Sequence, residues 1–163
     1  MKVAITGTPG TGKSHLSKKL AKKLGYTLIE LNEVIKKEKL YDCYDRSRRT
    51  YVTDIKKIKR HFKNLDKDVI IDSHLSHYLN VDIVIVLRCE PDKLRRRLIR
   101  KKWNKAKIEE NVEAEMISLI SWEARQRHKK VFDVDTSNNK ALSVMERIIK
   151  GKGTKYKKQI NWL

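Results

Sequence analysis

The chain has 163 residues, which is enough for one domain that buries its core without disulfides or metals. Its 39 Lys and Arg residues against 20 Asp and Glu give a net charge of +19, which exceeds what solubility requires and predicts an anionic partner such as RNA or a ribonucleoprotein. The Lys/Glu-rich surfaces of hyperthermophile proteins are the alternative, but their charge is usually mixed in sign. The two cysteines lack metal-binding spacing and no apolar run approaches the roughly 20 residues of a membrane span, so we expect a soluble, cytoplasmic protein without a membrane segment.

Short runs rich in Val and Ile alternate with helical patterns along the chain. The runs predict strands at 2–6, 26–31, 68–72, 82–88 and 131–136, and the helical patterns predict helices near 13–24, 53–63, 91–102 and 139–150. Near-continuous apolar runs are typical of strands buried on both faces, and alternation with helices indicates parallel strands joined by right-handed crossovers. The sequence therefore predicts an α/β domain with a doubly wound, five-stranded parallel sheet.

The segment GTPGTGKS follows the first predicted strand and opens the first predicted helix. It satisfies the phosphate-binding pattern GxxxxGK[ST] with Gly7, Gly12, Lys13 and Ser14. The glycines let backbone N–H groups surround the phosphates, while Lys13 reaches the β- and γ-phosphates and the Ser14 hydroxyl can ligate Mg²⁺. We therefore expect this P-loop to bind ATP and Mg²⁺.

Polar residues follow the third and fourth predicted strands, at the sheet edge where ligands bind in open α/β folds. Asp72 can hold a metal-bound water or orient a nucleophile, and His74 is either catalytic or a histidine that is structural or solvated. Arg88 can reach a transferring phosphoryl group or can pair with Glu90 or Asp92.

The last third of the chain contains a longer connection and a basic tail. Residues 103–130 predict a short turn at WNKA and then one helix, whose length favours burial of Trp122. The tail at 151–163 has four lysines and no acidic residue, so it is either a frayed terminus or a segment that docks on RNA or a partner. Trp162 is a candidate for a base-stacking or protein-docking anchor there.

Several of these motifs together resemble the adenylate kinase isoenzyme 6 type, a small, divergent branch of the nucleoside monophosphate kinases that is also described as an ATPase of small-ribosomal-subunit maturation. The motifs are GTPGTGKS, LYDCYD at 40–45, DSH at 72–74, VLR at 86–88 and the pair Glu110-Asn111. The resemblance covers about residues 1–150 as one domain. It implies a monophosphate-binding (NMP) segment at about 32–52 and a lid at about 100–110, with 151–163 as a separate basic tail.

The resemblance also implies roles for individual residues. The residues implied to surround ATP are Gly7, Gly10, Gly12, Lys13, Ser14, His15, Lys101 and Lys140, with Ser14 and Asp72 at the metal. Lys13, Asp72 and His74 are implied to be catalytic, and Lys36, Tyr41, Asp42 and Arg88 to bind the substrate. Two family arginines are replaced by Lys36 and Lys101, which lack the planar guanidinium, and the neighbouring Arg100 is expected to point elsewhere. Arg46, Arg48 and Arg49 either bind the acceptor phosphate or add to the RNA-facing charge.

Three functions remain open on these grounds. The first is an ATP-dependent nucleoside monophosphate kinase that converts ATP and AMP to two ADP. The second is an ATPase that acts on a small-subunit ribosomal protein or rRNA during ribosome maturation. The third is a kinase of another small metabolite, such as shikimate or a nucleoside, against which the LYDCYD segment counts.

Overall fold

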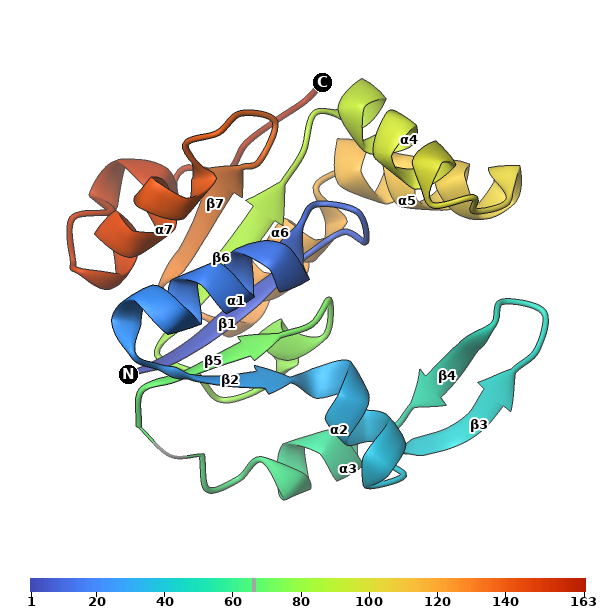
Figure 1. Ribbon diagram of the computed structural model, residues 1–163, viewed down its shortest axis with the longest axis horizontal. Helices are drawn as coiled ribbons and strands as arrows, with labels where there is room; N and C mark the ends of the chain where they lie inside the picture. Colours follow the sequence, from blue (N-terminus) through green and yellow to red (C-terminus); the bar gives the residue numbers. More distant parts are fainter. Residues whose placement is uncertain (66) are drawn as a thin grey trace.

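A computed structural model, which describes residues 1–65 and 67–163, contains a five-stranded parallel sheet with the strand order β2-β5-β1-β6-β7 (Figure 1). The strands are β1 (Lys2–Gly7), β2 (Thr27–Glu30), β5 (Val69–Asp72), β6 (Ile83–Arg88) and β7 (Val131–Asp135). The doubly wound α/β fold predicted from the alternation of apolar runs and helices is confirmed.

Helices cover both faces of the sheet. On one face lie α1 (Lys13–Leu24) and α7 (Ala141–Ile149); on the other lie α2 (Leu31–Lys37), α3 (Ile55–His61), α6 (Leu119–Arg127) and the short 3₁₀ helix η1 (Ser76–Tyr78). The side chains of β1 alternate between the two layers, since Val3 and Ile5 pack toward α1 and Ala4 packs in the opposite cluster. Both faces are therefore buried, which explains the uninterrupted apolar strands.

Two further helices lie at the carboxyl edge of the sheet. α4 (Pro91–Arg100) packs on α5 (Lys105–Met116) through a small apolar cluster that includes Leu94, Leu98 and Val112. A side chain at Gly10 would collide with Leu94 and Leu98, so glycine there allows the phosphate-binding loop to approach α4 closely. The packing of α4 therefore helps to fix the position of the loop.

A hairpin that the sequence did not predict projects from the domain (Figure 1). Its strands, β3 (Tyr41–Asp45) and β4 (Thr50–Thr53), form a separate antiparallel sheet. The Tyr51 ring packs between those of Tyr41 and Tyr44, with ring centroids 4.5 and 5.1 Å away. The segment predicted at 32–52 thus consists of most of α2 and this hairpin.

The prediction of one helix after the WNKA turn was wrong. Ser118 has a left-handed backbone with φ 57°, and it separates α5 from α6. The break turns α6 so that Ser121 and Ala124 face the core, which leaves Trp122 56% exposed. The prediction that Trp122 is buried was therefore also wrong.

The basic tail, predicted to be either frayed or docked on a partner, packs on its own domain. It contains the 3₁₀ helix η2 (Thr154–Lys157), where Tyr156 contacts the core beneath α7. The Arg125 guanidinium donates a 2.7 Å hydrogen bond to the carbonyl of Lys157, and the backbone N–H of Ile160 donates one of 2.9 Å to Asp133. Within the described residues no helix has both the length and the apolar character to cross a membrane.

Candidate active site

The phosphate-binding loop joins β1 to α1. Gly7, Gly10 and Gly12 all have positive φ, at 141°, 93° and 92°, which an L side chain rarely adopts. Gly12 caps α1, and the space where its side chain would lie is open. The loop therefore offers an open helix N-terminus with its backbone donors, and anionic phosphates fit that surface.

Lys13 lies folded back on the loop. Its ammonium donates hydrogen bonds of 2.8 Å to the Gly7 carbonyl and 3.1 Å to the Thr8 carbonyl. Burial lowers the pKa of Lys13 to about 8, while the negative charge of Asp72 acts in the opposite direction. The side chain is therefore still mostly a cation near pH 7, and phosphate oxygens can replace its carbonyl partners.

Asp72 and Ser14 supply oxygen ligands beside the loop. The strand register pairs Asp72 with Ile5 of β1, so the carboxylate lies next to the start of the loop. Burial raises the pKa of Asp72, and the Ser14 hydroxyl and the Lys13 ammonium oppose that rise. A hydroxyl and a carboxylate next to a phosphate surface are a donor set that fits Mg²⁺. The described part of the chain holds no group of three or more His, Cys, Asp or Glu suited to a metal ion.

His74 lies two residues after Asp72 and lines the cleft beside the phosphate-binding loop. Burial and then the charge of Lys13 lower the pKa of His74 to about 4. Its imidazole is therefore neutral near pH 7 and can accept a proton or a hydrogen bond.

One large cleft, of about 1270 Å³, connects the loop to the hairpin and to the α4–α5 turn. Gly10, Gly12, Lys13, Ser14 and His15 form one part of its lining. Arg48 at the hairpin tip and Arg100, Lys101 and Trp103 at the end of α4 lie around it, and α5 closes another side. Arg48 of the hairpin and Glu110 of α5 approach to 3.7 Å across the cleft.

Comparisons with known proteins show the family to which the chain belongs. The sequence matches the AAA domain family over residues 3–118. It is 37% identical over 162 residues to a Methanocaldococcus jannaschii protein named "Putative adenylate kinase", covering 98% of this chain and 89% of the relative. A Methanosarcina acetivorans protein of the same name is 42% identical over 150 residues, which cover 86% and 80% of the two chains. The chain belongs to this P-loop kinase family.

Solved structures show the same fold. Deoxyadenosine kinase from M. mycoides, with the products dCMP and dCDP bound, matches with a TM-score of 0.65 at 18% identity, covering 93% of this chain and 99% of that one. Shikimate kinase from Acinetobacter baumannii, in complex with shikimate, matches with a TM-score of 0.64 at 13% identity over 93% and 94% of the chains. At these identities the likeness concerns the fold alone.

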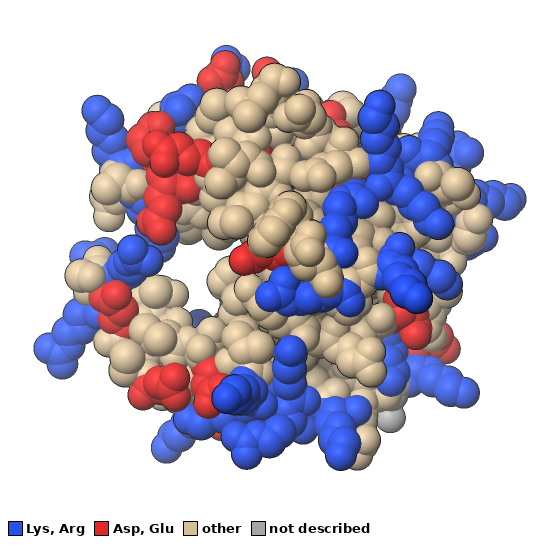
Figure 2. Space-filling model, turned by 180° about the vertical axis from the view of Figure 1, so that it is seen from behind, with Lys and Arg blue, Asp and Glu red and all other residues tan. Residues whose placement is uncertain are grey.

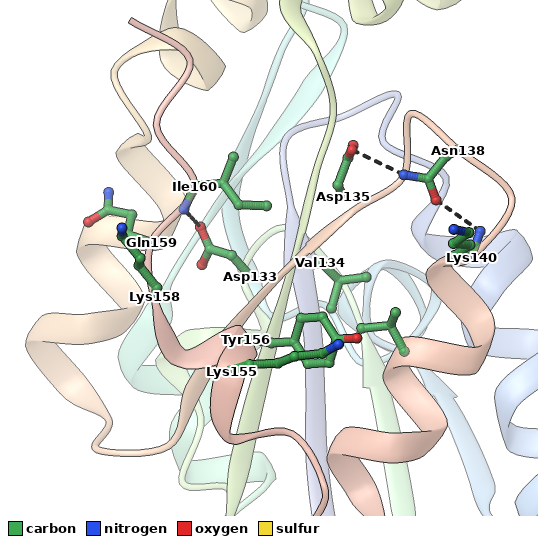
Figure 3. A pocket seen from close by; sticks show the side chains of 11 residues that line it. Asp133, Val134, Asp135, Asn138, Lys140, Lys155, Tyr156, Lys158, Gln159 and Ile160 are labelled. Atoms are coloured by element: carbon green, nitrogen blue, oxygen red, sulfur yellow. Dashed lines mark hydrogen bonds between the residues drawn. The ribbon is translucent and has the colours of Figure 1, made fainter.

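Several of the implied site residues do not line the cleft of this kinase, and four of them have other partners or lie elsewhere. The ammonium of Lys36 pairs with Glu33 at 3.2 Å, the ring of Tyr41 packs on Tyr51, and the carboxylate of Asp42 pairs with Lys57 at 3.2 Å. Lys140 instead lines a second cavity of about 380 Å³ between β7, α7 and the tail (Figure 3). In this conformation the structure does not bring these four residues to the phosphate-binding loop.

The placement of Arg88 corrects the sequence interpretation. Its side chain is 1% exposed, and it donates hydrogen bonds of 2.7 Å to Glu115 and 2.8 Å to Asp133. It pairs with neither Glu90 nor Asp92. Its guanidinium is paired with Glu115 and Asp133 in the core, and it does not line the cleft. Arg88 is therefore a core ion-pair residue and does not reach a phosphoryl group.

Sequence reasoning missed several residues of the cleft. Arg97 and Arg100 both line it, although Arg100 was expected to point elsewhere. Arg97 also donates a 2.7 Å hydrogen bond to the carbonyl of Thr136, which ties α4 to the loop after β7. The spacing gave a signal for both, since helical residues three or four apart lie on the same face.

Proposed function

We propose that this kinase transfers the γ-phosphoryl group of ATP to a nucleoside monophosphate, with AMP as the preferred acceptor. The observation that carries the proposal is the cleft of about 1270 Å³ that joins the phosphate-binding loop to the hairpin. Pockets for single drug-sized ligands are usually about 300–1000 Å³, so this cleft has room for a donor and an acceptor. The names of the archaeal relatives support AMP as the acceptor.

Charged residues on opposite sides of the cleft have complementary tasks in this proposal. Lys13 and the loop N–H groups bind the β- and γ-phosphates, while Arg100 and Lys101 at the lid neutralise charge on the transferring group. Arg48 binds the phosphate of the acceptor from the hairpin side. When bound, Mg²⁺ neutralises phosphate charge beside Ser14 and Asp72.

In the transfer step an oxygen of the acceptor phosphate attacks the γ-phosphorus, and the bond to the β-phosphate oxygen of ATP breaks, which yields two ADP when AMP is the acceptor. The neutral imidazole of His74 and the carboxyl group of Asp72 orient the reactants next to Lys13. The acceptor phosphate is already ionised, so it does not have to lose a proton before it attacks. Closure of the lid and hairpin excludes water, which would otherwise accept the phosphoryl group.

The test is ADP formation by the purified protein from Mg-ATP, with and without AMP, CMP or UMP. AMP is expected to raise turnover most strongly, and Lys13→Ala to abolish it. Shikimate and deoxyadenosine, added separately, test the metabolite-kinase alternative. Stimulation by either of these compounds, with none by any monophosphate, would overturn the proposal.

The charge of the molecule favours a second function, ATP hydrolysis in small-ribosomal-subunit maturation, as in the isoenzyme 6 type. Basic side chains surround the face shown in Figure 2, and acidic ones gather in a few small groups. A net charge of +19 has no use in binding AMP alone, but it favours contact with rRNA or a ribosomal protein. Slow turnover that monophosphates leave unchanged, and that small-subunit rRNA or protein raises, would favour this function.

A further inference from the structure

Glu115 of α5 is a buried carboxylate that joins four separate parts of the chain. Its side chain is 2% exposed. One carboxylate oxygen, Oε1, accepts hydrogen bonds from Arg88 Nε at 2.7 Å, from the backbone N–H of Cys89 at 3.1 Å and from the Trp162 indole at 3.0 Å. The other, Oε2, accepts a 2.6 Å hydrogen bond from the Thr8 hydroxyl. The three donors to Oε1 fix the orientation of the carboxylate, so that Oε2 faces the phosphate-binding loop.

Thr8 is the residue through which Glu115 reaches the loop. The Thr8 carbonyl accepts hydrogen bonds from Lys13 Nζ at 3.1 Å, from the Thr11 backbone N–H at 3.2 Å and from the Thr11 hydroxyl at 2.8 Å. The position of Thr8 thus sets both the internal hydrogen bonds of the loop and the resting position of its lysine. A carboxylate that holds the Thr8 side chain therefore acts on the phosphate site without touching the nucleotide.

The C-terminal segment supplies one of the donors that hold Glu115. The Ile160 backbone donates a 2.9 Å hydrogen bond to Asp133 (Figure 3), and the Ile160 carbonyl accepts one of 2.8 Å from Arg88. These two contacts place Trp162 against Glu115, and the Arg88 guanidinium lies 5.9 Å from the Trp162 ring centre. The tail thereby closes the carboxylate cluster over Arg88.

We propose that Glu115 is a positioning residue for the phosphate-binding loop, and that Trp162 at the C-terminus keeps its carboxylate aimed at Thr8. This rests on the nucleotide-binding part of the proposed function and not on the acceptor. The mechanism is pre-organisation, since a loop held in its binding shape loses less freedom when the phosphates bind.

The first experiment compares Thr8→Val with Thr8→Ser. Both substitutions suit a buried site, but only serine keeps the hydroxyl that donates to Glu115. We measure the Kd for Mg-ADP by calorimetry and the thermal midpoint of each variant. Thr8→Val is expected to weaken binding about tenfold, and Thr8→Ser to recover most of that loss. Equal affinity in the two variants would overturn the proposal.

The second experiment tests the tail. Trp162→Phe keeps an aromatic ring and removes the indole N–H, and it is expected to weaken Mg-ADP binding about threefold because two donors still hold Oε1. Leu163→Ala, at a neighbouring residue that is 79% exposed, is the control and leaves the Kd unchanged. A Trp162→Phe variant with a lower thermal midpoint and an unchanged Kd would show a purely structural role.

A double-mutant cycle then separates the path through Thr8 from any other. If Trp162 acts through Glu115 on Thr8, the effect of Trp162→Phe on the Kd disappears in the Thr8→Val background. Additive effects would contradict this path. Because the measurement is binding of Mg-ADP, failure of the protein to phosphorylate AMP leaves the test valid.

Discussion

Lys13, Asp72 and His74 lie together in a partly desolvated pocket where their charges depend on one another. Burial disfavours the charged form of each, so it lowers the pKa of Lys13 and of His74 and raises that of Asp72. The Lys13 cation and the Asp72 anion partly restore each other's charge. The result is one cation beside an acceptor imidazole, which suits the binding of a polyanion.

The pKa of about 8 for Lys13 predicts how activity depends on pH. The charged ammonium is the protonated form, so it is present below that pKa and lost as the pH rises through it. We expect kcat/KM for Mg-ATP to be constant near pH 7 and to fall above pH 8, because this ratio reports groups of the enzyme form to which Mg-ATP binds. His74, with a pKa of about 4, stays neutral across that range. A profile measured at saturating AMP that stays flat up to about pH 9.5 would contradict the assignment.

Arg48 offers a test of the acceptor side. Its guanidinium lines the cleft at the hairpin tip, whereas Arg46 of the same turn does not line it. Arg48→Ala is expected to raise the KM for AMP by about tenfold while kcat changes by less than about twofold, since it removes a binding contact. Because the ion pair between Arg48 and Glu110 is exposed, its loss should change the free energy of unfolding only slightly. Arg46→Ala is the matched control, and an equal rise in KM for both variants would show that only the overall charge matters.

Two features of different kinds shape the elements around the cleft, one marked in the local sequence and one that depends on distant contacts. Gly7 and Gly10 allow the loop to lie against β6 and α4; the phosphate-binding pattern includes Gly7, and the family resemblance implied Gly10. The break between α5 and α6 depends instead on Ser118, which has a left-handed backbone and whose hydroxyl accepts a hydrogen bond from Arg88 and donates one to the Ile160 carbonyl. Since serine is not a typical residue for this conformation, the break had no local signal.

The orientation of α6 leads to a prediction about stability. Trp122 is 56% exposed, whereas Met145 of α7 is fully buried. We expect Trp122→Ala to change the free energy of unfolding by less than about 1 kcal/mol, in contrast to about 2–5 kcal/mol for Met145→Ala. Urea denaturation of both variants provides the measurement. A loss at Trp122 as large as that at Met145 would mean that α6 is turned the other way.

Across the whole molecule, the features predicted from sequence were those that depend on neighbours along the chain. Apolar runs marked the strands, and GTPGTGKS marked the loop together with Lys13 and Ser14. The network of Arg88, Glu115 and the tail was not predictable, because its hydrogen-bonded pairs are far apart in sequence, by 107 residues for Thr8 and Glu115 and by 72 for Arg88 and Ile160. Burial decided the role of Arg88, and the sequence alone shows neither burial nor long-range pairing.

The net charge of +19 gives the last prediction, which concerns the molecule as a polycation. Four exposed lysines of the tail have no ion-pair partner anywhere in residues 1–65 and 67–163: Lys152, Lys155, Lys157 and Lys158. If they contact RNA phosphates, each contact releases condensed counterions, so the affinity for structured RNA falls steeply between about 50 and 200 mM salt. The double substitution Lys157→Gln and Lys158→Gln is expected to weaken binding to unrelated RNA sequences by similar amounts and to reduce the slope of log K against log salt by about 2.

The control pair Lys36→Gln and Lys150→Gln removes the same charge from lysines that already have carboxylate partners, and it should change the slope less. Equal changes for both pairs would mean that the tail lysines act only through net charge, and an affinity insensitive to salt would exclude the phosphate contacts altogether.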